Sequence, residues 1–155
     1  LAKLSLERAE EVTRHIAQEI AVQGGRIDGF FICPFVGREY ADKAIGKGNV
    51  VNPNYVQDDH PDSKPKTGML EKSAASMKRR LDEFQVYTIG DRLSDVQFGL
   101  NGGGTGILIA SKKTIELGDV ERVRELQKDY RDRVHIFGDY FEAARFIKRE
   151  SEKTN

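Results

Sequence analysis

Apolar residues follow two different periods along the chain, and these periods predict alternating helices and strands. Short apolar runs rich in β-branched and aromatic residues predict strands over residues 28–33, 85–90, 106–110 and 134–137. Apolar residues recurring every three or four positions predict helices over residues 6–23, 69–81, 92–100, 114–130 and 140–149. Ser5 is the expected N-cap of the first helix, and Gly24 its expected end. This alternation predicts an α/β fold, a doubly wound, Rossmann-like parallel sheet with helices on both faces.

Residues 34–67 show no such period and interrupt the alternation with scattered glycines, prolines and polar residues. Connections of this length are uncommon in compact domains and are usually functional, so a loop insertion near the active site is expected here. The chain as a whole predicts one domain over residues 1–150, and the last residues, 151–155, are expected to fray.

Composition narrows the classes of function. The 25 basic and 25 acidic residues cancel, so the chain has no general attraction for nucleic acid or for anionic membranes. No apolar run reaches the roughly 20 residues that span a bilayer. A single cysteine rules out an internal disulfide and a zinc site made of several cysteines. We therefore expect a cytoplasmic protein without a membrane or nucleic-acid partner.

Asp91 stands where chemistry is expected, at the end of the predicted strand in Gln85-Val-Tyr-Thr-Ile-Gly-Asp91. The carboxyl ends of parallel strands are where open α/β sheets bind ligands, and Mg²⁺ takes one or two such carboxylates. Asp is also a common N-cap, so from this stretch alone a metal ligand and a helix cap are both open.

Lys64 is the second candidate, in the sequence Ser63-Lys-Pro-Lys-Thr-Gly-Met69 directly before a predicted helix. Free N–H groups at a helix N-terminus attract anions, and an ammonium beside them neutralises charge on a phosphate. In so charged a sequence, the alternative for any single lysine is a solvated side chain, and Lys66 is assigned to that class.

Taken together, four motifs resemble those of the haloacid dehalogenase-like (HAD) phosphatases, in the branch of the histidinol-phosphate and heptose-bisphosphate phosphatases. The motifs are ICP (32–34), SKPKTGM (63–69), IGDRLSD (89–95) and NGGGTGILI (101–109), in the order and spacing of that family.

The resemblance implies a role for each matching residue. Lys64 corresponds to the lysine that steadies the transferred phosphoryl group, and Asp91 to the acid that binds Mg²⁺. Arg92 occupies a basic position close to substrate phosphate. Asp95 corresponds to a second acid, which acts on Asp91 or Lys64 rather than on the metal. Ser63 lies at the substrate-binding position of an arginine, and this replacement weakens the case for a bisphosphate sugar.

The chain also departs from the family pattern. The family attacks phosphorus with the first Asp of an Asp-x-Asp motif on its first strand, and no Asp-x-Asp occurs in these residues. We therefore expect a fold incomplete at the N-terminus and a chain inactive by itself. Its partner would be the missing N-terminal segment or a second copy. Cys33 is kept from the zinc loop of that branch, but Phe35 replaces a histidine. Zinc is not expected, and a polar loop is favoured over a substitute site at His60 with Asp58, Asp59 and Asp62.

These observations predict Mg²⁺-dependent hydrolysis of a small phosphorylated metabolite, a sugar or amino-alcohol phosphate. The covalent intermediate would be an aspartyl-phosphate whose Asp lies outside the chain. Two alternatives stay open: an inactive HAD-like domain with a binding or structural role, and a polynucleotide 3′-phosphatase. Neutral charge argues against the second.

Overall fold

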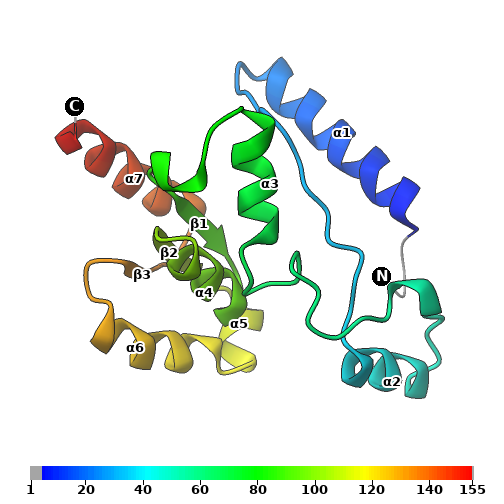
Figure 1. Ribbon diagram of the computed structural model, residues 1–155. Coiled ribbons are helices and arrows are strands. Elements are labelled where there is room, and N and C mark those ends of the chain that lie inside the picture. The colour runs from blue at the N-terminus through cyan, green and yellow to red at the C-terminus, as the bar shows by residue number, and fades with distance from the viewer. Residues whose placement is uncertain (1–4, 155) are drawn as a thin grey trace.

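The centre of the molecule is a three-stranded parallel sheet in the order β1-β2-β3 (Figure 1). The computed structural model describes residues 5–154. The strands are β1 (Tyr87–Gly90), β2 (Thr105–Ile109) and β3 (Val134–Phe137). Ile107 on β2 is in register with Ile89 on β1 and with His135 on β3. β2 is therefore the central strand, and β1 and β3 are the edges.

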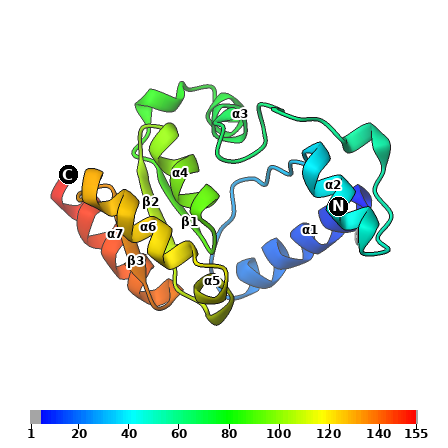
Figure 2. The same ribbon diagram turned by 90° about the horizontal axis from the view of Figure 1, so that it is seen from below.

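Seven α-helices lie within the described residues. They are α1 (Leu6–Val22), α2 (Arg38–Gly46), α3 (Gly68–Ser76), α4 (Leu93–Asn101), α5 (Lys112–Glu116), α6 (Asp119–Asp129) and α7 (Tyr140–Thr154). Figures 1 and 2 show α4 and α6 on one side of the sheet and α7 on the other. None of the helices in this part of the chain combines the length and apolar character needed to cross a bilayer. The predicted α/β fold with helices on both faces is confirmed.

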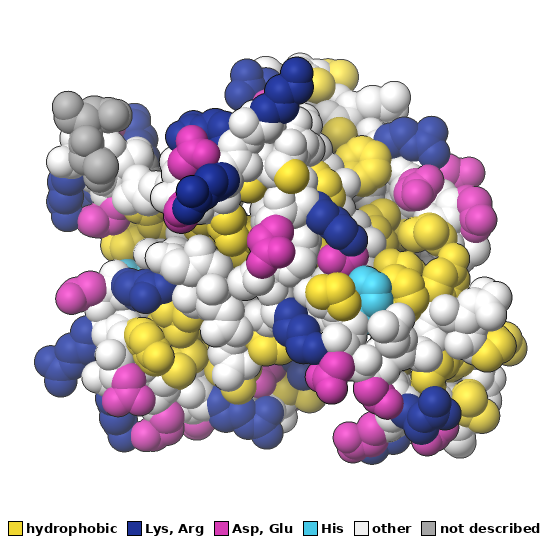
Figure 3. All heavy atoms as spheres, viewed as in Figure 1, with side chains coloured by type: hydrophobic (Ala, Val, Ile, Leu, Met, Phe, Trp, Pro, Cys, Tyr) yellow, Lys and Arg dark blue, Asp and Glu magenta, His cyan; other side chains and the backbone are white. Residues whose placement is uncertain are grey.

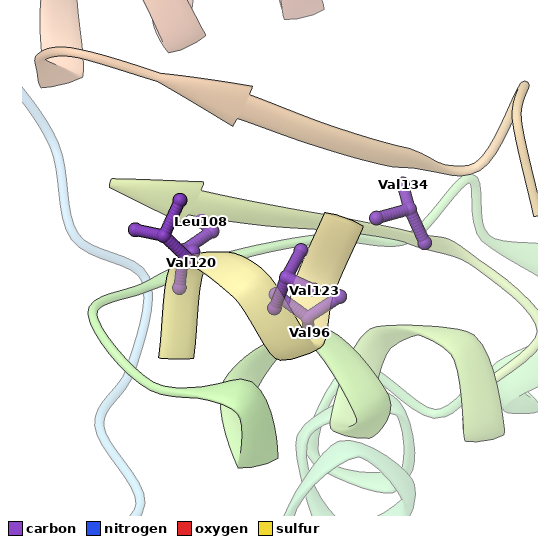
Figure 4. Close-up of a cluster of buried hydrophobic side chains, with 5 residues drawn as sticks. All are labelled: Val96, Leu108, Val120, Val123 and Val134. Carbon is purple, nitrogen blue, oxygen red and sulfur yellow. The ribbon is translucent and has the colours of Figure 1, made fainter. Parts of the chain in front are cut away.

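Two apolar clusters hold these layers together, one on each face of β2. Side chains on a strand point alternately to opposite faces, so Leu108 faces α4 and α6 while Ile107 and Ile109 face α7. The first cluster, drawn in Figure 4, consists of Val96, Leu108, Val120, Val123 and Val134. The second contains Ile107, Ile109 and Ala143. Both faces of β2 are buried, which explains why its sequence is a continuous apolar run.

The expected strand at residues 28–33 is wrong. These residues are extended but belong to no sheet, and Phe30 and Phe31 are 42% and 38% exposed. Within the described residues, the only bridge in this part of the chain joins Val36 to Val56. A strand needs a neighbour for its backbone groups; without one, the apolar pattern at 28–33 does not become a strand.

The expected loop at 34–67 is partly wrong, because it contains α2 and a 3₁₀ turn at Pro53–Tyr55. The predicted helix 69–81 ends at Ser76. The predicted helix 114–130 is two helices, α5 and α6, separated at Gly118 with φ of 71°. The expected frayed tail is wrong for residues 151–154, which continue α7; Asn155 lies outside the described residues.

Candidate active site

Lys64 and Asp95 form an ion pair beside the carboxyl end of β1. The Lys64 Nζ lies 2.5 Å from the Asp95 Oδ1. Asp95 belongs to the first turn of α4 and is only 7% exposed, whereas the Lys64 side chain is 42% exposed. The buried carboxylate thus fixes the direction of the lysine, whose side chain is still partly exposed to solvent. This arrangement suits a lysine that meets an incoming anion.

The carboxylate of Asp95 is itself held by its surroundings. Its Oδ2 accepts a hydrogen bond from the Arg92 backbone N–H at 3.1 Å, and its backbone carbonyl accepts one from the Thr88 hydroxyl at 2.9 Å. A Cβ at Gly90 would lie 2.2 Å from the Asp95 Oδ2. Glycine at position 90 is therefore required for the carboxylate to approach the end of β1 so closely.

Asp91 directly follows β1, and its two functional groups have different surroundings. Its backbone carbonyl accepts a hydrogen bond from the buried Thr114 hydroxyl at 3.1 Å. Among the described residues, its carboxylate has neither a hydrogen bond nor an ion pair. The helix cap is made by the Asp95 side chain on the Arg92 N–H, so Asp91 does not carry out the alternative role of N-cap.

One carboxylate near the end of β1 has no partner among the described residues and is available to a metal ion. Asp95 is committed to Lys64 and to the Arg92 N–H, which leaves the Asp91 oxygens as the available ligands. No group of three or more acidic, histidine or cysteine side chains suitable for a metal occurs in residues 5–154. Mg²⁺ keeps several waters and is often bound through one or two carboxylates and substrate phosphate. The Asp91 carboxylate is compatible with such a site.

The Arg92 guanidinium is paired with a buried acid at the start of α6. Its Nε lies 2.6 Å from the Oδ2 of Asp119, which is 1% exposed. Arg122 lies 3.4 Å from the other carboxylate oxygen. About half of the Arg92 side chain is exposed. The sequence pattern gave no sign of Asp119, because it begins a helix in which charged residues predominate.

Ser63 lies in a turn next to Cys33, the residue before the 34–67 segment. Its hydroxyl is 3.4 Å from the Cys33 Sγ. The His60 ring stacks on Phe35 with 3.8 Å between centroids, and its Nδ1 accepts a hydrogen bond from the Asp62 N–H. The expected histidine position of a zinc loop is therefore filled by a phenyl ring that packs on an imidazole.

The acids around His60 each have a structural partner. Asp58 accepts a hydrogen bond from the Arg38 N–H at the start of α2, Asp59 pairs with Lys66, and Asp62 pairs with Lys72. Lys66 is thus held within the loop, 3.1 Å from the Asp59 carboxylate. These contacts favour the polar-loop interpretation over a substitute metal site.

Asp62 and Asn101 are two polar residues whose structural contacts the sequence did not indicate. Asp62 is 6% exposed, and its Oδ1 is buried without a hydrogen-bond partner in the described residues. The Asn101 side-chain amide donates to the Pro65 carbonyl at 2.9 Å. Asn101 thereby joins the end of α4 to the turn that carries Lys64, so both ends of α4 contact that turn or its lysine.

A groove of about 310 Å³ opens next to the Lys64–Asp95 pair. One wall is the outer edge of β1, with Thr88 and Ile89, and another is Phe31. Helices α3 and α4 complete it with Met69, Leu70, Ser73 and Phe98. Burial is the main cause that raises the pKa of the Tyr87 phenol, which packs on the α7 side of the sheet, above its ordinary value.

Comparisons with known proteins agree with this fold. The crystal structure of D,D-heptose 1,7-bisphosphate phosphatase from B. bronchiseptica, complexed with magnesium and phosphate, matches with a TM-score of 0.61 and 19% identity. The match covers 94% of this chain and 66% of that one, so the chain spans just under two thirds of its length. No curated protein matches the sequence. The model of the HAD-hydrolase-like family matches residues 62–139, which include Lys64, Asp91 and Asp95. The chain therefore belongs to the HAD-like hydrolase family.

Proposed function

We propose that this chain is the larger part of a Mg²⁺-dependent phosphomonoesterase that acts on a small phosphorylated metabolite. The observation that carries the proposal is the buried Asp95 holding the Lys64 ammonium beside the end of β1, where the Asp91 carboxylate is unpaired. Phosphoryl transfer depends mainly on positioning and on neutralising the phosphoryl oxygens, and these groups supply both.

Each residue has a separate task in the proposed reaction. The Lys64 ammonium binds a phosphoryl oxygen and neutralises its charge. The Asp91 carboxylate would hold Mg²⁺, whose charge would further neutralise the phosphoryl oxygens when the ion is bound. Arg92 and Ser63 are proposed contacts of the substrate phosphate, Arg92 through the exposed part of a guanidinium whose Nε is held by Asp119.

The nucleophile is proposed to be an Asp outside residues 1–155. Its carboxylate oxygen forms a bond to phosphorus while the ester P–O bond breaks, and the leaving oxygen takes a proton from solvent water to become the alcohol. Water then hydrolyses the aspartyl-phosphate, releasing inorganic phosphate and restoring the carboxylate. A sugar or amino-alcohol phosphate is the proposed substrate class, and a bisphosphate sugar is disfavoured by Ser63.

The test is phosphate release by a longer protein that contains this chain, measured with sugar, amino-alcohol and nucleotide phosphates and with 3′-phosphorylated oligonucleotides. Lys64→Met should lower kcat by about 10²–10³-fold, the effect of removing one preorganised charge-stabilising group. Lys66→Met is the matched control, because Lys66 is in the same turn but contacts Asp59; its kcat should be nearly unchanged.

Asp91→Asn should sharply raise the Mg²⁺ concentration needed for half-maximal activity. Near-normal turnover in Lys64→Met would reject the site.

An inactive binding domain is the second candidate, since no Asp-x-Asp occurs in residues 1–155. Mg²⁺-dependent binding of inorganic phosphate by the longer protein, without release of phosphate from any substrate, would indicate such a binding domain.

A further inference from the structure

Asn101 makes a contact that its own helix does not need. Its side-chain amide donates to the Pro65 carbonyl at 2.9 Å, across 36 positions of the chain. The end of α4 is already closed by backbone hydrogen bonds that the N–H groups of residues 102–104 donate. Asn101 is also exposed, so without the contact its amide would bond to water instead. The amide therefore serves the segment that it reaches, which is the turn that carries Lys64.

The turn at residues 63–67 is attached to the rest of the molecule through this amide. Within the described residues, the Asn101 amide is the only side-chain group that hydrogen-bonds a backbone atom of the turn. The turn has its own hydrogen bond, from the Lys66 N–H to the Ser63 carbonyl at 3.0 Å. That bond gives the turn its shape but does not fix it relative to the sheet. The contact from Asn101 therefore places the backbone beside Lys64 relative to α4.

Helix α4 is a suitable reference because it is itself held firmly. A Cβ at Gly99 would lie 2.2 Å from the Thr88 Oγ1, which shows how closely the helix approaches β1. Val96 of the same helix is 0% exposed. At the end of the helix, the Arg133 guanidinium donates to the Leu100 carbonyl at 3.0 Å. A close-packed element of this kind does not shift easily, so its contacts set fixed positions.

The Lys64 side chain needs to be fixed at both ends because its four-carbon stem is flexible. Asp95 in the first turn of α4 holds the ammonium, and Asn101 in the last turn holds the backbone of the next residue. Figure 3 shows basic and acidic side chains interspersed over the face seen in Figure 1. No broad basic surface on this face therefore replaces one correctly placed ammonium.

We propose that Asn101 is a positioning residue for Lys64. It fixes the base of the lysine while Asp95 fixes the tip, so that a single helix sets both ends of the side chain. The inference rests on the proposed phosphatase function and adds a residue that contacts neither substrate nor metal. Misplacement of a reacting group by about 1 Å can cost about 10²-fold in rate, which is why a single hydrogen bond to the turn matters for catalysis.

The first test is phosphate release by the longer protein that carries Asn101→Ala. We expect kcat to fall by about 10–10²-fold. The Mg²⁺ concentration for half-maximal activity should stay the same, because the Asp91 carboxylate has no contact with Asn101. Gln97→Ala is the matched control: it removes an amide from the same helix, where Gln97 lines a hollow between α4 and α6. Its kcat should be nearly unchanged.

A double variant separates positioning from general support of the fold. In the Lys64→Met background, Asn101→Ala should lower kcat by less than about twofold further, because no ammonium remains to be positioned. Two residues that act independently would instead multiply their losses. Multiplied losses would overturn the proposal, and so would an equal rise in the Mg²⁺ requirement of Asn101→Ala and of Asp91→Asn.

Hydrogen exchange of the 155-residue chain tests the same contact without any activity. The Lys66 amide should exchange several-fold faster in Asn101→Ala, whereas the amides of Ile107 and Leu108 in the core should not change. Unchanged exchange at Lys66, or faster exchange at all three amides, would overturn the proposal.

The two hypotheses fail in different ways. Absence of phosphate release from the unaltered longer protein would reject the proposed function and, with it, the positioning role. Near-normal kcat in Asn101→Ala of an active longer protein would reject the positioning role alone.

Discussion

Asp95 shows how one buried side chain can organise a site made from three segments. One oxygen holds Lys64, and the other accepts the Arg92 N–H that begins α4. Asp91 and Asp95 are four positions apart and chemically identical, yet only Asp91 keeps its carboxylate unpaired in the described structure. The difference arises from surroundings that the sequence pattern does not display.

The buried pairing of Asp119 with two arginines could not be predicted from the sequence. Its carboxylate is buried, accepts a hydrogen bond from Arg92 and lies 3.4 Å from Arg122. Asp119→Asn keeps the shape but removes the charge opposite two guanidinium groups. We expect a loss of about 1–3 kcal/mol in the free energy of unfolding, measured by urea denaturation.

Glu121→Gln is the matched control, because Glu121 is exposed in the first turn of the same helix. Its free energy of unfolding should change by less than about 0.5 kcal/mol. Equal effects of the two substitutions would mean that the charge of Asp119 acts only on the helix dipole and not through Arg92.

The elements predicted best are those whose pattern is reinforced by a neighbour in the sheet. The β3 strand was predicted with its observed ends, and β1 and β2 within two residues, because each apolar run pairs with a neighbouring strand. The equally apolar run at 28–33 does not form a strand, because strand pairing requires a neighbouring segment as well as an apolar run. Helix α2 was missed because its apolar face is made of two alanines, Ala41 and Ala44.

At the site, sequence motifs drew attention to Lys64, Asp91 and Asp95. No local pattern indicated Asp119, and the motif that begins at Asn101 did not indicate its contact with Pro65; both residues act through contacts distant in sequence.

The break between α5 and α6 depends on the backbone of Gly118. This residue has φ of 71°, and a Cβ added there would meet no atom within 4 Å. Gly118→Ala therefore adds left-handed backbone strain without a steric clash, and we expect a loss of about 1–2 kcal/mol in the free energy of unfolding. Gly46→Ala, in the last turn of α2 and equally free of contacts, is the control. It should be neutral or slightly stabilising. A similar loss in both variants, measured by urea denaturation, would contradict the role assigned to the backbone at Gly118.

At the scale of the whole molecule, the described chain has a packed part and a weakly packed part. The sheet with α4, α6 and α7 contains both apolar clusters, whereas α1 buries none of its residues. Local opening is easiest where few apolar contacts must be broken. We expect amides of α1 to exchange through local opening and those of Ile107 and Leu108 only on global unfolding.

Native-state hydrogen exchange at increasing urea concentration measures this difference. Exchange of α1 amides should be nearly independent of low urea concentrations, and exchange of the β2 amides should rise steeply. Equal protection of α1 and β2 would show that α1 is part of the same cooperative unit.

The cap of α4 has a consequence for how activity and stability are connected. Lys64 reaches its working position only after three segments have assembled: the turn before α3, the end of β1 and the first turn of α4. The position of the Lys64 ammonium therefore depends on the correct packing of all three segments. In a longer, active protein, partial denaturation that loosens any one of these segments should therefore abolish catalytic activity before the rest of the sheet unfolds.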